Sequence, residues 1–182
     1  MVALPKILDS SVVCESRLFT IQKIGIKFSN GQLADYERLI GNGRGAGAVM
    51  IIPVLADSKI LLVREYAAGV ERYELGFVKG LIEEGESPLD AAHRELREEI
   101  GQDANLLEQL ATTSITPSYS DFKTHIFIAR DLFVSPLVGD EPEKLEILTW
   151  PLDSLSELRN RDDFSDSRSQ LATYLVAEKL KL

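Results

Sequence analysis

Two runs of hydrophobic residues dominate the pattern of the chain. AVMIIPVL (48–55) and KILLVREYA (59–67) are rich in β-branched residues and are separated by only Ala-Asp-Ser (56–58). Runs that are apolar at nearly every position are typical of strands buried on both faces. We predict that the two runs form a hairpin in the centre of a sheet.

Residues 17–39 show the alternating pattern of another hairpin. Apolar residues recur at every second position before the turn, which places them on one face of a strand. The dipeptide Asn30-Gly31 then predicts a type I′ turn, in which both central residues adopt positive φ. The glycine-rich segment GNGRGAG (41–47) follows and separates this hairpin from the rest of the chain.

The remaining pattern consists of short strands and a few helices. Four segments have strand-like patterns and two have helical spacing: 73–80, 107–115, 125–132 and 145–150, then 152–158 and 167–180. Strands thus precede and follow one central helix, described next. This order predicts an α+β fold in which helices pack on a mixed β-sheet.

The stretch GLIEEGESPLDAAHRELREEIG (80–101) contains the best-marked helix, predicted from Pro88 to Ile100. Ser87 is a favourable N-cap, and proline suits the first helical position. Gly101 fits the left-handed residue that ends a helix. One stripe of this helix is apolar and is expected to pack on the sheet: Leu89, Ala92, Leu96 and Ile100.

Three acidic residues form a second face of the same helix. Glu95, Glu98 and Glu99 have i, i+3 and i+4 spacing, at which like charges repel each other. Such a cluster destabilises a helix but suits a hard cation, because Mg²⁺ binds carboxylate oxygens. Arg94 is placed to contact Glu98 at i+4. The alternative interpretation is an acidic helix face that is only solvated.

Composition narrows the class of protein. The chain has 182 residues, which suggests one domain with a small appendage, and its formal net charge is −9 with a pI of about 4.8. This charge argues against nucleic acid as a partner. The single cysteine, Cys14, excludes an internal disulfide, and no run reaches the length of a membrane helix. We therefore expect a cytoplasmic protein without a membrane partner.

The acidic helix and the loop before it resemble the Nudix box. The spacing Gly-x5-Glu-x7-Arg-Glu-apolar-x-Glu-Glu-x-Gly is matched at every charged and glycine position: Gly80, Glu86, Arg94, Glu95, Glu98, Glu99 and Gly101. Only Gln102, where the family usually has an aliphatic residue, departs from the pattern. Because many positions match at fixed spacing, the resemblance is specific.

The resemblance implies a fold, an activity and a cofactor. Nudix hydrolases have a mixed sheet sandwiched between α-helices and cleave nucleoside diphosphates linked to another group, using Mg²⁺ or Mn²⁺. By position, Glu95 and Glu99 would be the main metal ligands, Glu98 a further ligand or catalytic group, and the Lys79 carbonyl another ligand. Glu86 and Arg94 would fix the loop and helix, with Gly80 and Gly101 as structural glycines.

Further motifs resemble the ADP-ribose pyrophosphatase-like subfamily, and within it the bacterial ADP compounds hydrolases of the NudE type. Pro117 lies sixteen residues after Gly101, where the subfamily has a proline. The segments SRLFT, YERL, YELGFVKGLI and GDEPE extend the resemblance over residues 15–180. It implies ADP-ribose, diadenosine di- and triphosphates and NADH as small-molecule substrates, with AMP and a phosphorylated remainder as products.

In related enzymes a catalytic glutamate comes from a loop well after the box. Here VGDEPEKLE (138–146) supplies Glu141 and Glu143, which we predict to be the base or water-positioning group and a metal-binding helper. The alternative is an acidic surface loop, because loops are usually polar.

Substrate contacts are expected from cations and rings near the box. Arg64 is a candidate phosphate partner, because a guanidinium pairs well with oxyanions. Further candidate cations are Arg38 and Arg44, candidate stacking rings are Tyr66, Tyr36 and Phe28, and Glu74 is a candidate extra carboxylate. For each ring the alternative is packing within the fold, and for Glu74 it is a structural ion pair.

The predicted domains are an N-terminal β unit (1–44) and a Nudix hydrolase domain (45–182). Free edges of the N-terminal hairpin favour pairing with another strand. In related enzymes this unit joins a homodimer, and we expect a homodimer here.

Two other functions compete with this hypothesis. The chain would be a hydrolase of another nucleoside diphosphate sugar if its base recognition differed, because the box does not contact the base. It would be a nucleotide sensor if it bound without cleavage, although sensors are expected to lose box carboxylates and all are present here.

Overall fold

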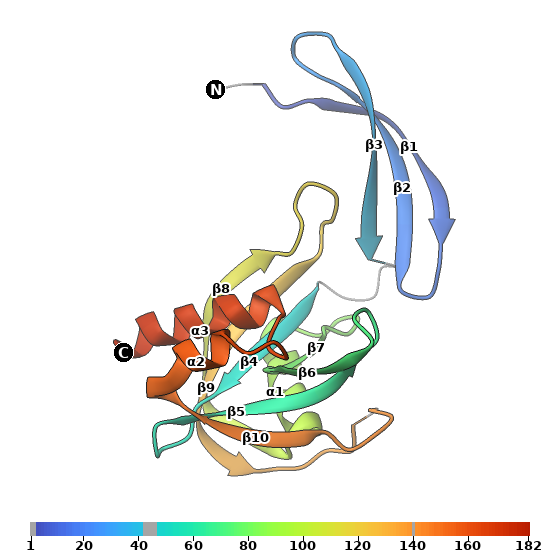
Figure 1. The fold of residues 1–182 in the computed structure, drawn as a ribbon. Helices are drawn as coiled ribbons and strands as arrows, with labels where there is room; N and C mark the ends of the chain where they lie inside the picture. Colours follow the sequence, from blue (N-terminus) through green and yellow to red (C-terminus); the bar gives the residue numbers. More distant parts are fainter. Residues whose placement is uncertain (1–2, 42–46, 140) are drawn as a thin grey trace.

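The computed structural model describes residues 3–41, 47–139 and 141–182 (Figure 1). The strands of this part of the chain form three sheets, of which the first contains β1 (Lys6–Glu15), β2 (Phe19–Lys27) and β3 (Leu33–Gly41). The second sheet contains, in spatial order, β10 (Glu146–Pro151), β5 (Lys59–Ala67) and β6 (Arg72–Gly76). The third contains, in spatial order, β7 (Val78–Leu81), β4 (Ala48–Pro53), β9 (Lys123–Val134) and β8 (Gln102–Ser114). The helices are α1 (Pro88–Glu99), the 3₁₀ turn η1 (Leu152–Ser154), α2 (Leu155–Arg159) and α3 (Ser167–Leu180).

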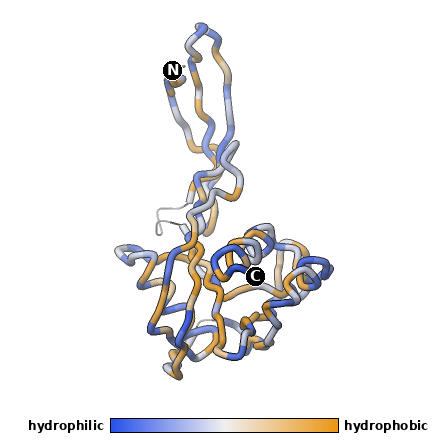
Figure 2. The backbone as a smooth tube through the Cα atoms, turned by 90° about the vertical axis from the view of Figure 1, so that its left-hand side faces the viewer, coloured by the Kyte–Doolittle hydropathy of each residue, from blue (hydrophilic) through white to orange (hydrophobic). Residues whose placement is uncertain are grey.

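The β1–β2–β3 sheet stands apart from the rest of the molecule as an arm (Figures 1 and 2). Strand β1 was not predicted from the sequence. Two irregularities in its pairing with β2, at Ile7/Asp9 and Val12/Cys14, interrupt the period of two that would have indicated a strand. Every residue of β1 is exposed, including the single cysteine.

The turn between β2 and β3 is not the predicted type I′ turn. Gly31 has a φ of 85°, whereas Asn30 is not among the described residues with positive φ. The Gly31 N–H donates to the Phe28 carbonyl, and the Phe28 N–H donates to the Gln32 carbonyl, both at 2.9 Å. A three-residue loop with glycine in the left-handed position therefore replaces the two-residue turn, and it still produces a hairpin.

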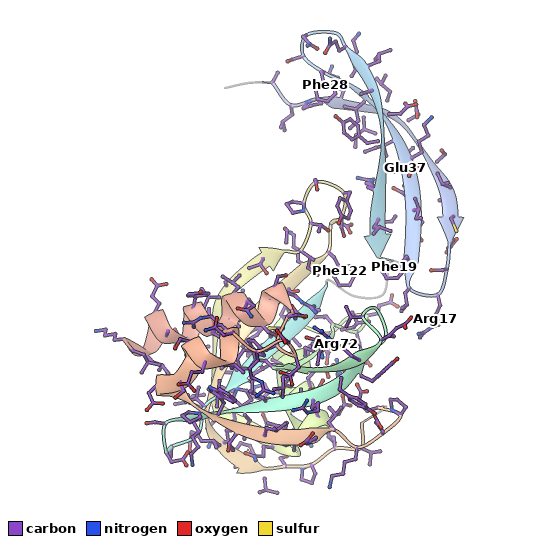
Figure 3. All side chains as sticks on the ribbon, in the orientation of Figure 1. Arg17, Phe19, Phe28, Glu37, Arg72 and Phe122 are labelled. Carbon is purple, nitrogen blue, oxygen red and sulfur yellow. The ribbon has the colours of Figure 1, made fainter. Side chains whose placement is uncertain are left out.

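The end of β3 contacts the loop between β8 and β9. The Leu39 N–H donates to the Tyr119 carbonyl at 2.7 Å, and Leu39 pairs with Ser120 in a parallel bridge. Figure 3 shows Phe122 of the same loop at this junction. The predicted boundary at 44/45 falls in the segment 42–46, outside the described residues.

The predicted central hairpin is wrong in its pairing, although both strands exist. After the single bridge Val54–Ile60, β4 pairs with β7 and β9 while β5 pairs with β6 and β10. The chain also changes sheet at Phe77, so the single strand predicted at 73–80 is two strands, β6 and β7. Apolar runs indicate burial on both faces but do not specify the partner.

Buried side chains form two cores on opposite sides of the strands. On β4, Met50 and Ile52 join a core with α2 and α3, whereas Val49 and Ile51 join a core with α1. Alternate residues of the same strand thus belong to different cores. The pairing of β4 with β9 is parallel and its pairing with β7 is antiparallel, so the sheet is mixed. The predicted α+β architecture, a mixed sheet between helices, is confirmed, with the correction that the strands of the main body form two sheets.

The helices begin and end close to their predicted bounds. The C-terminal helix spans Ser167–Leu180 as predicted, and the segment 152–158 forms η1 and α2. In the part of the chain that the structure describes, no helix has the length and apolar character needed to cross a membrane.

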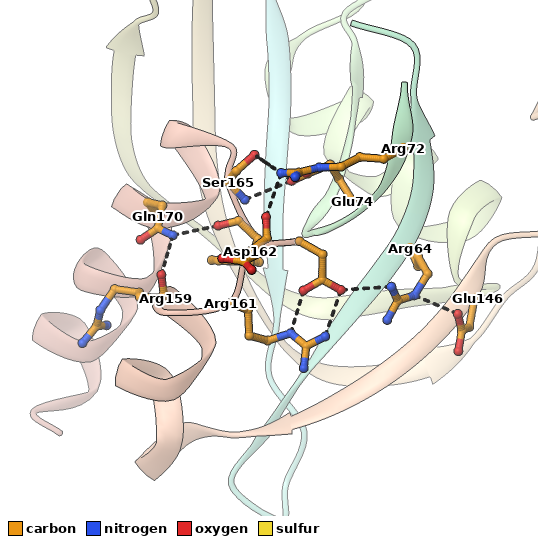
Figure 4. A network of polar contacts seen from close by, with 11 residues as sticks. Arg64, Arg72, Glu74, Glu146, Arg159, Arg161, Asp162, Ser165 and Gln170 are labelled. Atoms are coloured by element: carbon orange, nitrogen blue, oxygen red, sulfur yellow. Dashed lines mark hydrogen bonds and ion pairs between the residues drawn. The ribbon is translucent and has the colours of Figure 1, made fainter. Parts of the chain in front are cut away.

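Asp163 ties the α2–α3 segment to β5. Its carboxylate accepts two hydrogen bonds from Arg161 at 2.8 Å and one from Arg64 at 3.0 Å, and Arg64 also pairs with Glu146 at 2.9 Å (Figure 4). The hydrogen bonds from Arg161 hold the pKa of Asp163 below its usual value. Arg64 is therefore part of a structural network.

We expect Asp163→Asn to reduce the free energy of unfolding by about 2 kcal/mol at pH 7, because it removes charge-assisted hydrogen bonds. The pKa of Asp163 is lower in the folded than in the unfolded protein, so its contribution is present above the unfolded pKa. It is lost as the pH falls through the folded pKa. Urea unfolding should thus show a difference at pH 7 that shrinks below about pH 4.

Asp162→Asn is the matched control for this prediction. Arg72 contacts Asp162 through its backbone carbonyl at 2.7 Å, which the substitution retains. Equal losses in both variants would contradict the role assigned to the Asp163 carboxylate.

Candidate metal and active site

Helix α1 places the acidic residues at the edge of a core. The Ser87 side chain accepts a hydrogen bond from the Asp90 N–H at the N-terminus, and Gly101 adopts a φ of 66° after the C-terminus. Ala91 and Glu95 are buried, whereas Leu89, predicted to pack on the sheet, is 45% exposed. Compared with the predicted apolar stripe, the buried face of α1 is thus rotated toward the carboxylates, and it includes Glu95.

Arg94 connects the box loop to the helix. Its Nε and Nη2 atoms donate to the two oxygens of Glu86 at 2.9 and 3.0 Å, and Nη2 also donates to the Leu81 carbonyl at 2.8 Å. Its Nη1 atom donates to Glu95 at 2.6 Å and to Glu98 at 2.9 Å. The hydrogen bonds from Arg94 lower the pKa of Glu86, so this carboxylate stays ionised.

Gly80 is a point where strand β7 approaches helix α1 closely. A Cβ atom at this position would lie 1.9 Å from Oε1 of Glu95 and 2.0 Å from its Cδ. Any other residue would displace the buried carboxylate. The glycine is therefore required by the position of Glu95.

Glu99 is only partly buried as a residue, but one of its carboxylate oxygens is shielded from solvent. Its Oε1 accepts a hydrogen bond from the Lys79 N–H at 3.4 Å, while its buried Oε2 has no hydrogen-bond partner in the described part of the chain. Burial raises the pKa of Glu99 well above its usual value. A bound cation would satisfy the buried oxygen and stabilise the charged form.

These residues fit a hard divalent cation. All three carboxylates of the cluster, Glu95, Glu98 and Glu99, offer hard oxygen ligands. Over residues 3–41, 47–139 and 141–182, no three acidic, histidine or cysteine side chains converge as a ready-made metal site. Arg94 accounts for this geometry, because it holds Glu95 and Glu98 while Glu99 faces the backbone of Lys79.

Glu141 lies between two cavities that flank the acidic cluster. One cavity, of about 490 Å³, is lined by Glu98, Glu99 and the loop after β9. The other, of about 530 Å³, is lined by Gly80, Glu95 and strand β7. Glu141 lines both cavities, so the structure brings this predicted catalytic residue to the box.

Glu143 lines the first cavity but is tied to β6. Its Oε1 accepts a hydrogen bond from the Tyr73 hydroxyl at 2.8 Å. The predicted catalytic role of Glu143 stays a prediction. The observed hydrogen bond connects the loop to β6.

Two of the predicted substrate residues lie in the neighbourhood of the box. Tyr66 and Glu74 line a third cavity of about 620 Å³, which shares Lys79 with the cavity beside Gly80. Tyr66 packs edge-on against Tyr73 at a centroid distance of 5.6 Å. Glu74 accepts hydrogen bonds from the Ser165 N–H and hydroxyl at 2.9 Å and pairs with Arg72, so it is held in a structural network.

The remaining predicted contacts lie elsewhere. Arg64 shares a strand face with Leu62, which belongs to the α2–α3 core, and so points away from α1. Arg38 binds Gln22 at 3.0 Å within the arm, where Phe28 also packs on Tyr36 with centroids 6.4 Å apart. Arg44 lies outside the described residues.

Pro117 occupies a turn in the loop between β8 and β9, near the contact with β3. This is the loop that also carries Phe122.

Three residues near the box were not predicted as site residues, and a fourth, Lys79, was predicted only through its backbone carbonyl. Glu65, Lys79, Phe122 and Arg168 all line the cavity beside Gly80. Alternation along β5 would have indicated Glu65 in place of Arg64, once the face toward α1 was known. No pattern in the sequence indicates Arg168, because α3 reaches the box only in the folded chain.

Comparisons with known proteins identify the family of the chain. The NUDIX domain matches residues 45–173, and the NudE-type Nudix hydrolase N-terminal domain matches residues 5–38. The chain is 47% identical over 177 residues to ADP compounds hydrolase NudE of Escherichia coli, covering 97% of this chain and 94% of that protein.

Two further comparisons extend this result. ADP-ribose pyrophosphatase of Bacillus subtilis is 26% identical over 178 residues, with 93% of this chain and 94% of that protein covered. A crystal structure of an ADP compounds hydrolase superposes with a TM-score of 0.91 at 45% identity, covering 100% of this chain and 96% of that chain. With a matched domain over most of its length and the box residues in place, this chain belongs to the Nudix family of hydrolases.

Proposed function

We propose that this Nudix hydrolase cleaves the diphosphate linkage of ADP-linked compounds. The proposed substrates are ADP-ribose, diadenosine di- and triphosphates and NADH, which release AMP and a phosphorylated remainder. The similar proteins are named for ADP compounds and ADP-ribose. The partner is thus a small-molecule nucleotide.

The buried, unpartnered Oε2 of Glu99 is the observation that supports this proposal most directly. Nudix hydrolases use a divalent metal, and we assign Mg²⁺ here, with Mn²⁺ as a substitute of similar ligand preference. Glu95, Glu98, Glu99 and the Lys79 carbonyl would hold it. When bound, the metal neutralises the diphosphate and activates water for attack on phosphorus.

The residues of the chain prepare this chemistry. Arg94 holds Glu95 and Glu98 in place, and Gly80 leaves the space that the Glu95 carboxylate occupies. Glu141, which lines both cavities beside the cluster, would accept a proton from the attacking water at its carboxylate.

The arm supports the predicted homodimer. Several apolar side chains of the arm are more than half exposed: Ile7, Leu8, Val12, Val13, Phe19 and Leu33. An exposed sheet of this kind favours pairing with a second copy. The homodimer, the absence of a nucleic-acid partner and the cytoplasmic location stay predictions.

The proposed activity predicts metal-dependent release of AMP from ADP-ribose, diadenosine triphosphate and NADH. Purified protein should release AMP from all three with Mg²⁺ and none after chelation with EDTA. GDP-mannose is the control substrate. Faster turnover of GDP-mannose than of ADP-ribose would favour another nucleoside diphosphate sugar, and binding without turnover would favour a sensor.

Glu99→Gln should have opposite effects on activity and on stability. It removes a metal ligand, so turnover of ADP-ribose should fall by at least about 100-fold. It also removes a buried carboxylate with an unpartnered oxygen, so the melting temperature in EDTA should rise. Differential scanning fluorimetry measures the second effect, and Mg²⁺ should stabilise only the wild type. Equal stabilisation of both by Mg²⁺ would contradict the ligand role.

Gly80→Ala should displace the Glu95 carboxylate, because the added Cβ would lie 1.9 Å from Oε1. We expect the Mg²⁺ concentration for half-maximal activity to rise by at least about tenfold. Gly41→Ala is the control, because its Cβ would meet Phe122 at an ordinary 3.8 Å. An unchanged Mg²⁺ requirement in Gly80→Ala would refute the close-approach argument.

A further inference from the structure

We propose that Lys79 and Arg168 form a two-cation clamp for the phosphates of the substrate. In the free protein each cation is held by a carboxylate, Glu65 for Lys79 and Asp166 for Arg168, which the substrate replaces. This inference rests on the proposed function, because it names the residues that hold a diphosphate beside the box.

The two cations lie where the cavities meet. Of the described residues, Glu65, Lys79 and Arg168 alone line both the cavity beside Gly80 and the cavity beside Tyr66. A diphosphate that extends from the box toward Tyr66 must pass them. The two cavities, of about 530 and 620 Å³, are each within the usual range for a small-molecule site.

To bind a diphosphate, the acidic site needs cations that are not already held by several carboxylates. Arg94, the other cation lining the cavity beside Gly80, is bound to three carboxylates and the Leu81 carbonyl. Lys79 and Arg168, by contrast, each pair with one carboxylate, and their side chains are 27% and 25% exposed. These two residues can exchange a partner without disturbing the box.

Lys79 joins the acidic cluster to the clamp. Its neighbours Val78 and Gly80 face α1, so its side chain projects from the opposite face of β7 and reaches Glu65 on β5. Its backbone N–H donates to Glu99. Lys79 thus contacts a proposed metal ligand through its backbone and also carries the ammonium group that would bind the phosphates.

Arg168 lines the same two cavities from helix α3. It lies in the first turn of α3, and its Nε and Nη2 atoms bind the carboxylate of Asp166, the N-cap of that helix. A guanidinium can bind two phosphate oxygens at once. The cations on β7 and α3 thus face a ligand from two elements that the fold holds apart.

Steady-state kinetics with ADP-ribose at saturating Mg²⁺ tests the clamp. Lys79→Met and Arg168→Met should each raise KM by about 10-fold to 100-fold, which is the loss of one charge-assisted hydrogen bond. The turnover number should change less than threefold, since the metal ligands are intact. Lys79→Arg and Arg168→Lys, which keep the charge, should restore most of the affinity and show that loss of folding is not the cause.

Lys59→Met is the matched control. Lys59 pairs with Asp57 at 2.6 Å in an exposed turn, so its removal should leave KM unchanged. A merely structural role for Lys79 would act through Glu99 and raise the Mg²⁺ concentration needed for half-maximal activity, whereas the clamp predicts an equal or lower Mg²⁺ requirement in Lys79→Met. A higher Mg²⁺ requirement with unchanged KM would overturn the clamp.

Glu65→Gln gives a prediction of opposite sign. Removing the resting partner of Lys79 should lower KM for ADP-ribose about threefold, because the substrate no longer competes with Glu65. The gain should disappear in the double variant with Lys79→Met. An equal gain in both backgrounds would overturn the exchange of partners.

Binding of inorganic pyrophosphate with Mg²⁺, measured by calorimetry, separates the two proposals. Binding that weakens in Lys79→Met and Arg168→Met supports the clamp, even if the wild type does not release AMP and the proposed function fails. Pyrophosphate binding that is unchanged in both variants overturns the clamp, whatever the turnover of ADP-ribose.

Discussion

The guanidinium of Arg94 is the interaction on which the box depends. It joins three carboxylates and the Leu81 carbonyl, which come from the end of β7, the loop after it and helix α1. Without this charge, the acidic side chains would repel one another across a single helix face. Arg94 offsets that repulsion for Glu86, Glu95 and Glu98 and leaves Glu99 as the carboxylate without such a partner.

The fold makes this division of roles possible by placing α1 against a sheet in which strand β4 is fully buried. Helix α1 contributes Ala91, Ala92 and Leu96 to one core, and the same rotation brings Glu95 next to Gly80 and buries Glu99 beside Lys79. The opposite core, with α2 and α3, brings the start of α3 near β7. The two faces of the main-body strands thus position both the acidic cluster and the cations that surround its cavity.

Much of this arrangement could be predicted from the sequence, for identifiable physical reasons. The caps of α1 and the spacing of its acidic residues are local, so the helix and the box residues were predicted at their observed positions. The pairing of β4 and β5 was not predicted correctly, because an apolar run indicates that a strand is buried but does not specify which strand it pairs with. Strand β1 was missed because its irregular pairing hides the period of two. Glu65, Lys79 and Arg168 meet through tertiary packing alone, which no local pattern encodes.

The parallel pairing of β4 with β9 has a consequence for how the protein folds. Ala48 lies opposite Thr124, so the segment between them, which contains β7 and α1, must close as a long loop before the two strands can pair. Such non-local pairing slows folding, whereas a capped helix can form early and locally. This difference predicts that the acidic helix forms before the sheet that buries it, and that Glu99 loses water only in the late step. Competence to bind metal should then appear with the final closure of the sheet, so the rate of recovering metal affinity would report the slowest event in refolding.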